Sequence, residues 1–206
     1  MLDKNLSYIY GLLITDGYLN KKNNKIVGIG LEVNIKDLDI VEKLHNVIPF
    51  SSIYYRSRKT NFSDNYDSCI FQYNRKDLPN KLIEYGFPVD NKTFLARAPL
   101  IEYDKVAFWR GAIDGDGSLG LRKNGNAFLS FTTQSEDLKK DFCLFLQSIT
   151  GRQYNPNRNK RDNIYNIGCN GHSAEKVIKI LYENIDKDDL FLNRKYNKMK
   201  DILKIE

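Results

Sequence analysis

The sequence predicts an α+β protein made of two pseudo-symmetric αββαββα units, each with an antiparallel sheet and with its first helix at the interface between the units. Three observations support this prediction. The 206-residue chain repeats itself at an offset of 100 residues, its strand-like segments come in pairs, and each copy contains a helix that is apolar on nearly all sides. We therefore divide the chain into an N-terminal half, residues 1–98, and a C-terminal half, residues 99–206.

The repeat is clearest where each half contains its apolar helix. The segment YIYGLLITDGYLN, residues 8–20, aligns with FWRGAIDGDGSLG, residues 108–120. Further along, LEVNIKDL aligns with FTTQSEDL at the same offset. The aligned pairs that matter most are Gly11 with Gly111, Asp16 with Asp116, Gly17 with Gly117, and Asn34 with Gln134.

In the N-terminal half, the all-round apolar character of residues 5–15 predicts a buried helix that ends at Asp16 and Gly17. Two alternating segments around the turn-forming pair Asn23 and Asn24 predict a hairpin, and apolar residues at helical spacing predict a second helix after it. A second strand pair and a third helix complete the unit. The predicted elements are helix 5–15, strands 18–22 and 25–34, helix 36–47, strands 52–59 and 67–73, and helix 77–85.

The C-terminal half has the same order of elements after its own apolar helix. Residues 86–104, with Pro88 and Pro99, form the predicted linker between the halves. The predicted elements are strands 118–123 and 126–134, helix 136–149, strands 152–159 and 163–169, helix 173–184 and a last helix at 190–204.

The composition excludes several classes of protein. Apolar residues make up 41% and charged residues 28% of the chain, so global disorder is excluded. No apolar run approaches the roughly 18–20 residues of a bilayer span, and no leader precedes the first helix, so we expect no membrane segment and no secretory signal. Cys69, Cys143 and Cys169 form neither a disulfide framework nor a zinc motif, which favours an intracellular location. A bacterial or phage cytoplasm and an organelle with an AT-rich genome both fit.

Alternation along the strands assigns one polar face to each sheet. The net charge of +6 and the polar side chains of these faces suit contacts with phosphates and base edges. A merely solvated sheet face would also be polar, so the pattern alone leaves that alternative open. The candidate DNA-binding residues are Tyr18, Asn20, Lys22, Glu32, Tyr54, Arg56, Arg58, Gln72, Ser118, Arg122, Asn126, Ser130, Thr132, Gln153, Asn155, Asn157, Asn159 and Asn166.

Asp16 and Asp116 are the strongest candidates for a catalytic role. A carboxylate at a helix C-terminus opposes the helix dipole, and this arrangement occurs twice. Gly11 and Gly111 lie within the two apolar helices, where glycine costs about 0.8–1.0 kcal/mol relative to alanine, so we expect the helices to pack closely. The two carboxylates would then meet at one end of the interface and form a site for a hard cation such as Mg²⁺. A metal held by a pair of acids can support the hydrolysis of phosphodiesters.

Simpler explanations of these acids are weaker. A single Asp-Gly pair is more often a turn or a helix cap than a catalytic motif, but the duplication favours function. The string DGDGSLG resembles a calcium loop, but Gly125 would then stand where a bidentate acid is needed. Asp114 has Ile14 as its counterpart and is interpreted as a capping or interface residue. No phosphate-binding glycine motif follows a strand, so no nucleotide cofactor is expected.

These motifs resemble those of the LAGLIDADG homing endonucleases. WRGAIDGDG, residues 109–117, is similar to the motif that names the family, and IYGLLITDG, residues 9–17, is a looser second copy. Ile14 and Thr15 depart from the pattern, whereas the acid position is retained. The resemblance covers essentially the whole chain and implies a single-chain member with two motifs, whose two sheets form a DNA-binding saddle.

The resemblance also implies roles for individual residues. Asp16 and Asp116 match the metal-binding acids, and Gln134, with Asn34, matches a polar residue that orders water near the scissile phosphates. Lys92 and Lys195 are the candidate pocket lysines, with Arg194 as the alternative to Lys195. All of these except Arg194 are our predicted catalytic residues. Mg²⁺ is the implied cofactor, and Mn²⁺ or Ca²⁺ can occupy the same site.

The implied function is site-specific cleavage of double-stranded DNA across the minor groove, at a long recognition site, by a monomer with internal pseudo-twofold symmetry. Intron or free-standing gene mobility is the expected role; no segment outside the two halves suggests an intein. Two alternatives use the same fold without cleavage, namely a DNA-binding regulator and an RNA intron maturase. A third, a protein-interaction domain, leaves the paired acids and the polar sheet faces unexplained.

Overall fold

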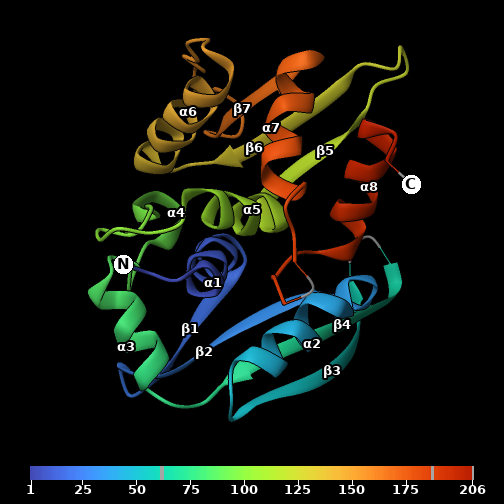
Figure 1. Ribbon diagram of the computed structural model, residues 1–206. Helices are drawn as coiled ribbons and strands as arrows, with labels where there is room; N and C mark the ends of the chain where they lie inside the picture. The colour runs from blue at the N-terminus through green and yellow to red at the C-terminus, as the bar shows by residue number, and fades with distance from the viewer. Residues whose placement is uncertain (61–62, 187, 206) are drawn as a thin grey trace.

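Two antiparallel sheets lie on either side of a central pair of helices in the computed structural model, which describes residues 1–60, 63–186 and 188–205 (Figure 1). The central helices are α1 (Lys4–Thr15) and α5 (Lys105–Asp116). Each begins at an aspartate whose side chain accepts a hydrogen bond from a helix N–H: Asp3 from Leu6 at 2.7 Å, and Asp104 from Ala107 at 2.8 Å. The two helices expected at the interface are therefore both present there.

Gly11 and Gly111 allow α1 and α5 to touch through their backbones. A Cβ atom added to Gly11 would lie 2.0 Å from the carbonyl oxygen of Phe108, and one added to Gly111 would lie 2.2 Å from that of Tyr8. The contacts are reciprocal, since residues 8 and 108 are equivalent in the repeat. The close approach predicted from the two glycines is confirmed.

The first sheet has four strands in the order β1-β2-β4-β3: β1 (Gly17–Lys22), β2 (Lys25–Asn34), β4 (Ser63–Tyr73) and β3 (Ser51–Thr60). Asn23 and Asn24 form the β1–β2 turn with φ of 49° and 59°, the left-handed pair that a two-residue hairpin favours. A 3₁₀ turn (Ile35–Asp37) leads into α2 (Leu38–Val47), and α3 (Asp77–Glu84) follows β4. Both α2 and α3 lie against this sheet.

The second sheet has three strands in the described residues, in the order β5-β6-β7: β5 (Gly117–Leu121), β6 (Ala127–Thr133) and β7 (Tyr165–Asn170). The strand predicted at 152–159 is wrong. In the described part of the chain, a single bridge, between Arg158 and Tyr165, joins this segment to β7. The segment is rich in Asn and Pro, which are among the residue types least favoured in strands.

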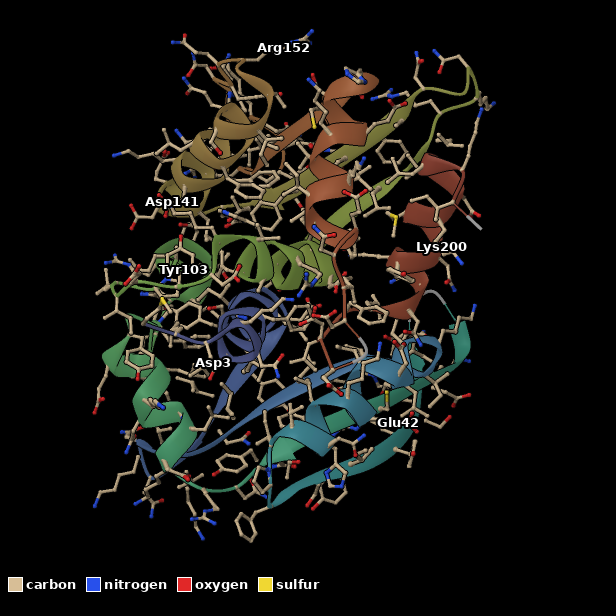
Figure 2. All side chains as sticks on the ribbon, viewed as in Figure 1. Asp3, Glu42, Tyr103, Asp141, Arg152 and Lys200 are labelled. Atoms are coloured by element: carbon tan, nitrogen blue, oxygen red, sulfur yellow. The ribbon has the colours of Figure 1, made fainter. Side chains whose placement is uncertain are left out.

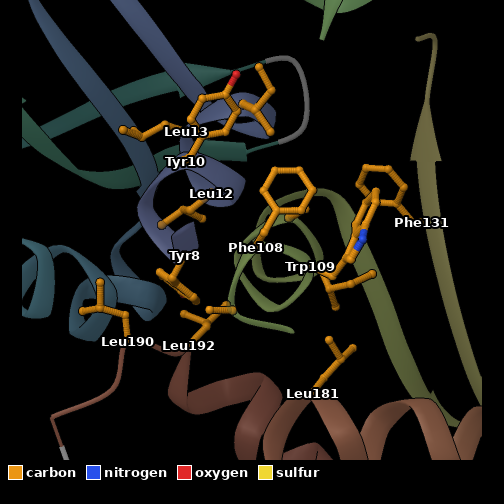
Figure 3. Close-up of a cluster of buried hydrophobic side chains, with 14 of the residues drawn as sticks. Tyr8, Tyr10, Leu12, Leu13, Phe108, Trp109, Phe131, Leu181, Leu190 and Leu192 are labelled. Atoms are coloured by element: carbon orange, nitrogen blue, oxygen red, sulfur yellow. The ribbon is translucent and has the colours of Figure 1, made fainter. Parts of the chain in front are cut away.

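Helices α6 (Glu136–Thr150) and α7 (His172–Tyr182) cover the inner face of the second sheet, and α8 (Asn193–Leu203) lies against α7 and β5 (Figure 1). Aromatic rings connect the layers. Phe108 contacts Tyr10 of α1 and Trp109, with centroid separations of 6.1 and 4.8 Å, and Trp109 contacts Phe131 of β6 at 5.7 Å (Figure 3). One continuous core therefore runs from α1 through α5 to the second sheet.

The α+β class, the antiparallel sheets and the interfacial helices are confirmed. The predicted linker contains a short helix, α4 (Lys92–Leu95), which packs against α6 of the other half. A boundary between residues 98 and 99 stays a prediction. Labelled charged residues such as Glu42, Arg152 and Lys200 lie on the periphery (Figure 2), and no helix in the described part of the chain is long and apolar enough to cross a membrane.

Candidate active site at the ends of the central helices

Asp16 and Asp116 lie at the C-terminal ends of α1 and α5, each immediately before the first strand of its sheet. Both residues are exposed to solvent. The Asp16 carboxylate oxygen Oδ2 lies 3.1 Å from the position of a Cβ atom on Gly115, so it touches the chain one residue before Asp116. The fold therefore brings the two acids, 100 residues apart in sequence, to the same end of the interface.

The acids share an environment that disfavours negative charge. Desolvation by the surrounding protein atoms is the largest cause that raises the pKa of Asp16 to about 6, followed by the charge of Asp116, while Lys92 and Lys195 oppose the rise. Asp16 is exposed to solvent when the whole residue is considered, but protein atoms surround its carboxylate group closely enough to desolvate it. Desolvation also raises the pKa of Asp116, again opposed by Lys92 and Lys195. A divalent cation between the acids would relieve both penalties.

Lys92 and Lys195 occupy equivalent positions in the two halves. The Lys92 ammonium donates to the carbonyl oxygens of residues at the end of α1, including Thr15 at 2.6 Å and Leu13 at 3.3 Å, and to that of Gly17. The Lys195 ammonium donates at the end of α5, to Asp114 at 2.8 Å, Gly115 at 3.4 Å and Gly117 at 2.9 Å, and also to Ile113. Each lysine thus binds the negative end of the central helix of its own half.

The structure places Lys195, not Arg194, opposite Lys92. Lys195 is 3% exposed, and burial lowers its pKa to about 8. Burial also lowers the pKa of Lys92. Arg194 instead makes two hydrogen bonds to the Asp37 carboxylate, at 2.8 and 2.9 Å, and so connects α8 to the N-terminal half.

Two small pockets flank the acids. One, of about 220 Å³, is lined by Asp116 and Gln134 together with Thr15 and Lys92. The other, of about 210 Å³, is lined by Asp16 and Asn34, with Gly115 and Arg194 among its other residues. Each pocket therefore combines an acid and the predicted polar residue of one half with the helix end of the other half.

The two pockets differ in charge. Glu32 and Asp37 also line the Asp16 pocket, whereas Thr132 takes the place of Glu32 in the Asp116 pocket. Asn34 caps the 3₁₀ turn by accepting a hydrogen bond from Lys36 N at 3.0 Å. The backbone oxygen of Gln134, which lines the Asp116 pocket, accepts one from Arg158 Nη2 at 3.1 Å.

Asp114 is a structural residue of the interface. It is 4% exposed, and its carboxylate accepts hydrogen bonds from Tyr8 Oη at 2.7 Å, Tyr182 Oη at 2.6 Å and Leu192 N at 2.9 Å. Arg110, one turn earlier, is buried and donates to the backbone oxygens of residues 181 and 190. Asp114 was interpreted from the sequence as a capping or interface residue, whereas Arg110 and the tyrosines were not singled out, because their partners lie far away in sequence.

Strand register shows which candidate DNA-binding residues share a sheet face. Tyr18 lies next to Gly30 and its ring covers that glycine. The predicted residues that the register puts on the outer face of the first sheet are Tyr18, Asn20, Glu32, Tyr54, Arg56, Arg58 and Gln72. Those on the outer face of the second sheet are Ser118, Ser130, Thr132 and Asn166.

The remaining candidates lie outside the regular strand faces. Lys22 follows a bulge at the end of β1, and Arg122 and Asn126 face each other across the β5–β6 turn. Gln153, Asn155, Asn157 and Asn159 are exposed but are not on a strand, because none forms at 152–159. Their assignment to a sheet face is therefore wrong. Ser68, Phe128 and Asn170, which were not among the candidates, also lie on the outer faces according to the strand pairing.

Glu32 organises the charges of the first sheet. It accepts a hydrogen bond from Ser68 Oγ at 2.7 Å and forms ion pairs of 3.3 Å with both Arg56 and Arg58. These pairs are exposed and contribute little to stability. Their effect is to hold two guanidinium groups over the outer face of the sheet.

The raised pKa of Asp16 leads to a prediction about stability. The carboxyl ionises near pH 3.8 in an unfolded chain and near 6 in the folded protein, so the folded state binds more protons between these values. The free energy of unfolding should fall as the pH rises from about 4 to about 6. The Asp16→Asn variant has no carboxyl group at this position and so lacks this pH dependence. Its free energy of unfolding relative to that of wild type should therefore increase from about pH 4 to about pH 6 and then level off. Urea denaturation without divalent cations measures this, and parallel pH profiles would contradict it.

Comparison with known proteins identifies the fold. The family model described as LAGLIDADG-like domain matches residues 104–183, which include α5, the second sheet and α7. No curated protein sequence matches the chain. The structure of the homing endonuclease I-WcaI bound to its DNA recognition sequence superimposes with a TM-score of 0.63 at 13% identity, covering 97% of this chain and 87% of that one.

Two further structures show the same likeness. The LAGLIDADG meganuclease I-CpaMI, bound to uncleaved DNA, gives a TM-score of 0.59 at 10% identity and covers 97% of this chain and 92% of its own. The N-terminal LAGLIDADG domain of DUF199/WhiA gives 0.55 at 14% identity, with coverage of 89% and 82%. At these identities the likeness is one of fold. The resemblance seen in the sequence motifs is thus confirmed: this chain has the fold of the LAGLIDADG homing endonucleases over nearly its full length, and its C-terminal half contains a LAGLIDADG-like domain.

Proposed function

We propose that this chain is a monomeric, site-specific endonuclease of double-stranded DNA that depends on a divalent cation. The observation that carries the proposal is the meeting of Asp16 and Asp116, each with an equivalent lysine, at the junction of two polar sheet faces. The DNA complexes of I-WcaI and I-CpaMI, which share the fold, support DNA as the substrate. The proposed role is intron or free-standing gene mobility inside a cell.

The donor groups at the helix ends fit Mg²⁺. Carboxylate oxygens are hard ligands, and the raised pKa values of Asp16 and Asp116 show two acids in a place that favours an added positive charge. Within the described residues, no group of three or more His, Cys, Asp or Glu side chains could hold a metal by itself. Water and phosphate oxygens would have to complete the coordination shell, which Mg²⁺ accepts readily.

The residues of the chain have separable tasks in this proposal. Asp16 and Asp116 would hold the cation, which when bound activates water and stabilises the leaving oxygen. Lys92 and Lys195 hold the helix ends in position and add positive charge where the phosphate would become more negative. Gln134 and Asn34 line the two pockets, where their amide groups can orient water.

Cleavage of a selected DNA site tests the proposal. Duplexes that bind the protein are first isolated from a randomised library and then incubated with the protein in Mg²⁺, Mn²⁺, Ca²⁺ or EDTA. We expect discrete double-strand breaks in Mg²⁺ and Mn²⁺ and none in EDTA. The Asp16→Asn/Asp116→Asn double variant should bind without cleaving, whereas Asp201→Asn, at an exposed position on α8, should cleave as wild type does.

A second candidate, a DNA-binding regulator or RNA maturase that does not cleave, is favoured by one observation. The LAGLIDADG domain of WhiA shares the fold, so the fold is not restricted to proteins named as endonucleases. Tight, salt-sensitive binding to a selected site without breaks in any cation would support this candidate, and the nature of the preferred nucleic acid would separate its two forms.

DNA binding through the first sheet makes a prediction for Arg56 and Arg58. If both contact phosphates, each alanine variant should weaken binding at all sites and reduce the slope of log K against log salt by roughly 0.9. Binding titrations between about 50 and 200 mM salt measure the slope. Lys179→Ala on α7 is the control, since α7 covers the inner face of the other sheet. An unchanged slope in both arginine variants would show that this face does not contact DNA.

A further inference from the structure

The outer face of the second sheet contains a hollow of about 430 Å³ that the proposed function does not by itself explain. It lies on the face that carries Ser118 and Thr132, away from the covering helices α6 and α7. The residues that line it and bear on its chemistry are Arg122, Phe128, Ser130, Asn166, Gly168 and Asn170.

Two glycines shape the hollow. Gly120 lies beside Phe128, and a Cβ atom there would be 3.1 Å from a Phe128 ring carbon, so the ring covers the bare backbone of β5. Gly168 lies beside Ser130, and a Cβ atom there would be 2.5 Å from the backbone oxygen of Leu129. A side chain at position 168 would thus clash with the backbone, and the floor of the hollow stays open.

Arg122 is held at one edge of the hollow. Its Nε and Nη2 atoms both donate to Asn170 Oδ1, at 3.2 and 2.8 Å, and its guanidinium carbon lies 5.8 Å from the centroid of the Phe128 ring. Two partners therefore restrict an exposed arginine before any ligand arrives. Such ordering lowers the entropic cost of binding, and the guanidinium retains further N–H donors for a base edge.

In the described part of the first sheet, the outer face has no phenylalanine in a position like that of Phe128. Residue 28, equivalent to Phe128 in the repeat, is glycine, and a Cβ atom there would lie 2.3 Å from the backbone oxygen of Tyr73. The outer-face aromatic residues of that half are tyrosines: Tyr18 covers Gly30, Tyr54 lies in β3, and the Arg58 guanidinium carbon lies 5.6 Å from the centroid of the Tyr66 ring. Among the described residues of the two outer sheet faces, a phenyl ring without a hydroxyl group beside an ordered arginine occurs only on the second sheet.

The chemistry of the hollow selects among the groups that DNA presents. Phosphate oxygens gain nothing from a phenyl ring. In the major groove, the apolar group on a base edge is the 5-methyl group of thymine, and the acceptor pair that suits an arginine is O6 and N7 of guanine. The polar groups of Ser130 and Asn166 at the other side of the hollow suit the remaining edge atoms of a base pair.

We infer that Phe128, with Arg122 ordered by Asn170, forms a subsite that recognises a 5-methylpyrimidine in the half-site bound by the C-terminal half. The inference rests on the proposed binding of double-stranded DNA. Phe128 packs against the methyl group, and Arg122 donates to the edge of a neighbouring base. The target is therefore sensitive to pyrimidine methylation in one half-site only.

Removal of single methyl groups from the DNA tests the inference. In a selected target duplex, each dT is replaced by dU, one at a time, and equilibrium binding is measured. Loss of one buried methyl group should weaken wild-type binding about fourfold at one or two positions, all in one half-site. At such a position, a duplex with 5-methyl-dC should bind wild type more tightly than the same duplex with dC.

Variants of the protein show which residue reads the methyl group. In Phe128→Ser the difference between dT and dU should vanish at those positions, whereas Tyr18→Ala, the matched aromatic change in the other half, should retain it. Wild-type binding that is indifferent to every methyl group overturns the inference, even if Phe128→Ser fails to fold. A methyl effect that persists in Phe128→Ser also overturns it. Absence of any sequence-specific DNA binding would instead overturn the proposed function.

Discussion

Asp116→Asn is expected to lower the rate of double-strand cleavage by about 10³-fold, or about 4 kcal/mol of transition-state stabilisation. Asparagine keeps the shape of the side chain but removes the negative charge that would hold a divalent cation beside Asp16. DNA affinity should change little, because the sheet faces, and not the helix ends, supply most of the proposed contacts. Single-turnover cleavage of a selected duplex in Mg²⁺ measures the rate, with binding measured in Ca²⁺.

The same substitution should not destabilise the protein. Desolvation raises the pKa of Asp116, so its ionised form is disfavoured in the folded state at neutral pH. Loss of activity together with unchanged or increased stability would separate a catalytic role from a structural one. Asp201→Asn should change neither quantity. Wild-type cleavage by Asp116→Asn would show that this acid does not hold the metal.

Gly111→Ala is expected to destabilise the fold by about 3 kcal/mol, even though alanine is the better helix former. The new Cβ atom would lie 2.2 Å from the backbone oxygen of Tyr8 and 2.9 Å from the backbone nitrogen of Leu12. Backbone atoms cannot move away without separating α1 from α5, and that separation would also pull Asp16 away from Asp116. Urea denaturation and cleavage assays should therefore both show losses.

Gly115→Ala is the matched control on the same helix. Its Cβ atom would meet the side-chain oxygen of Thr15 at 2.0 Å, so a side chain rather than backbone stands in the way. The added substitution Thr15→Gly, which removes both Thr15 Oγ1 and the Thr15 Cβ atom at 2.9 Å, should restore part of the stability of Gly115→Ala, whereas no side-chain change on α1 should rescue Gly111→Ala. A Gly111→Ala protein as stable as wild type would show that the helices have room to separate.

The sequence carries a strong signal for the central helices and the acids because that signal is local and occurs twice. An apolar helix with a buried glycine, followed by Asp-Gly, needs a close neighbour and places a carboxylate at its end, whatever surrounds it. The hairpins and the polar sheet faces followed from alternation and from Asn23 and Asn24. Strand 152–159 was predicted wrongly because the alternation of side chains was given more weight than the Asn and Pro residues of this segment, which are disfavoured in strands.

Which groups surround the acids was decided by tertiary structure. Sequence alone left Lys195 and Arg194 as alternatives, because the two residues are adjacent and both are basic. The position of the segment before α8 distinguishes them, because Leu192 N donates a hydrogen bond to Asp114 and the Arg194 side chain donates one to Asp37. The resulting geometry directs the Lys195 ammonium to the end of α5.

The sequence by itself determined the repeat, the two interfacial helices, the pair of acids and the period of the sheet faces, since each depends on residues within one or two turns or along one strand. Tertiary structure decided the buried network of Asp114 with Tyr8 and Tyr182, the two pockets of mixed origin and the hollow beside Phe128. These features join residues from different elements, and the distance between such residues is set by how helices and sheets pack, which no local pattern encodes.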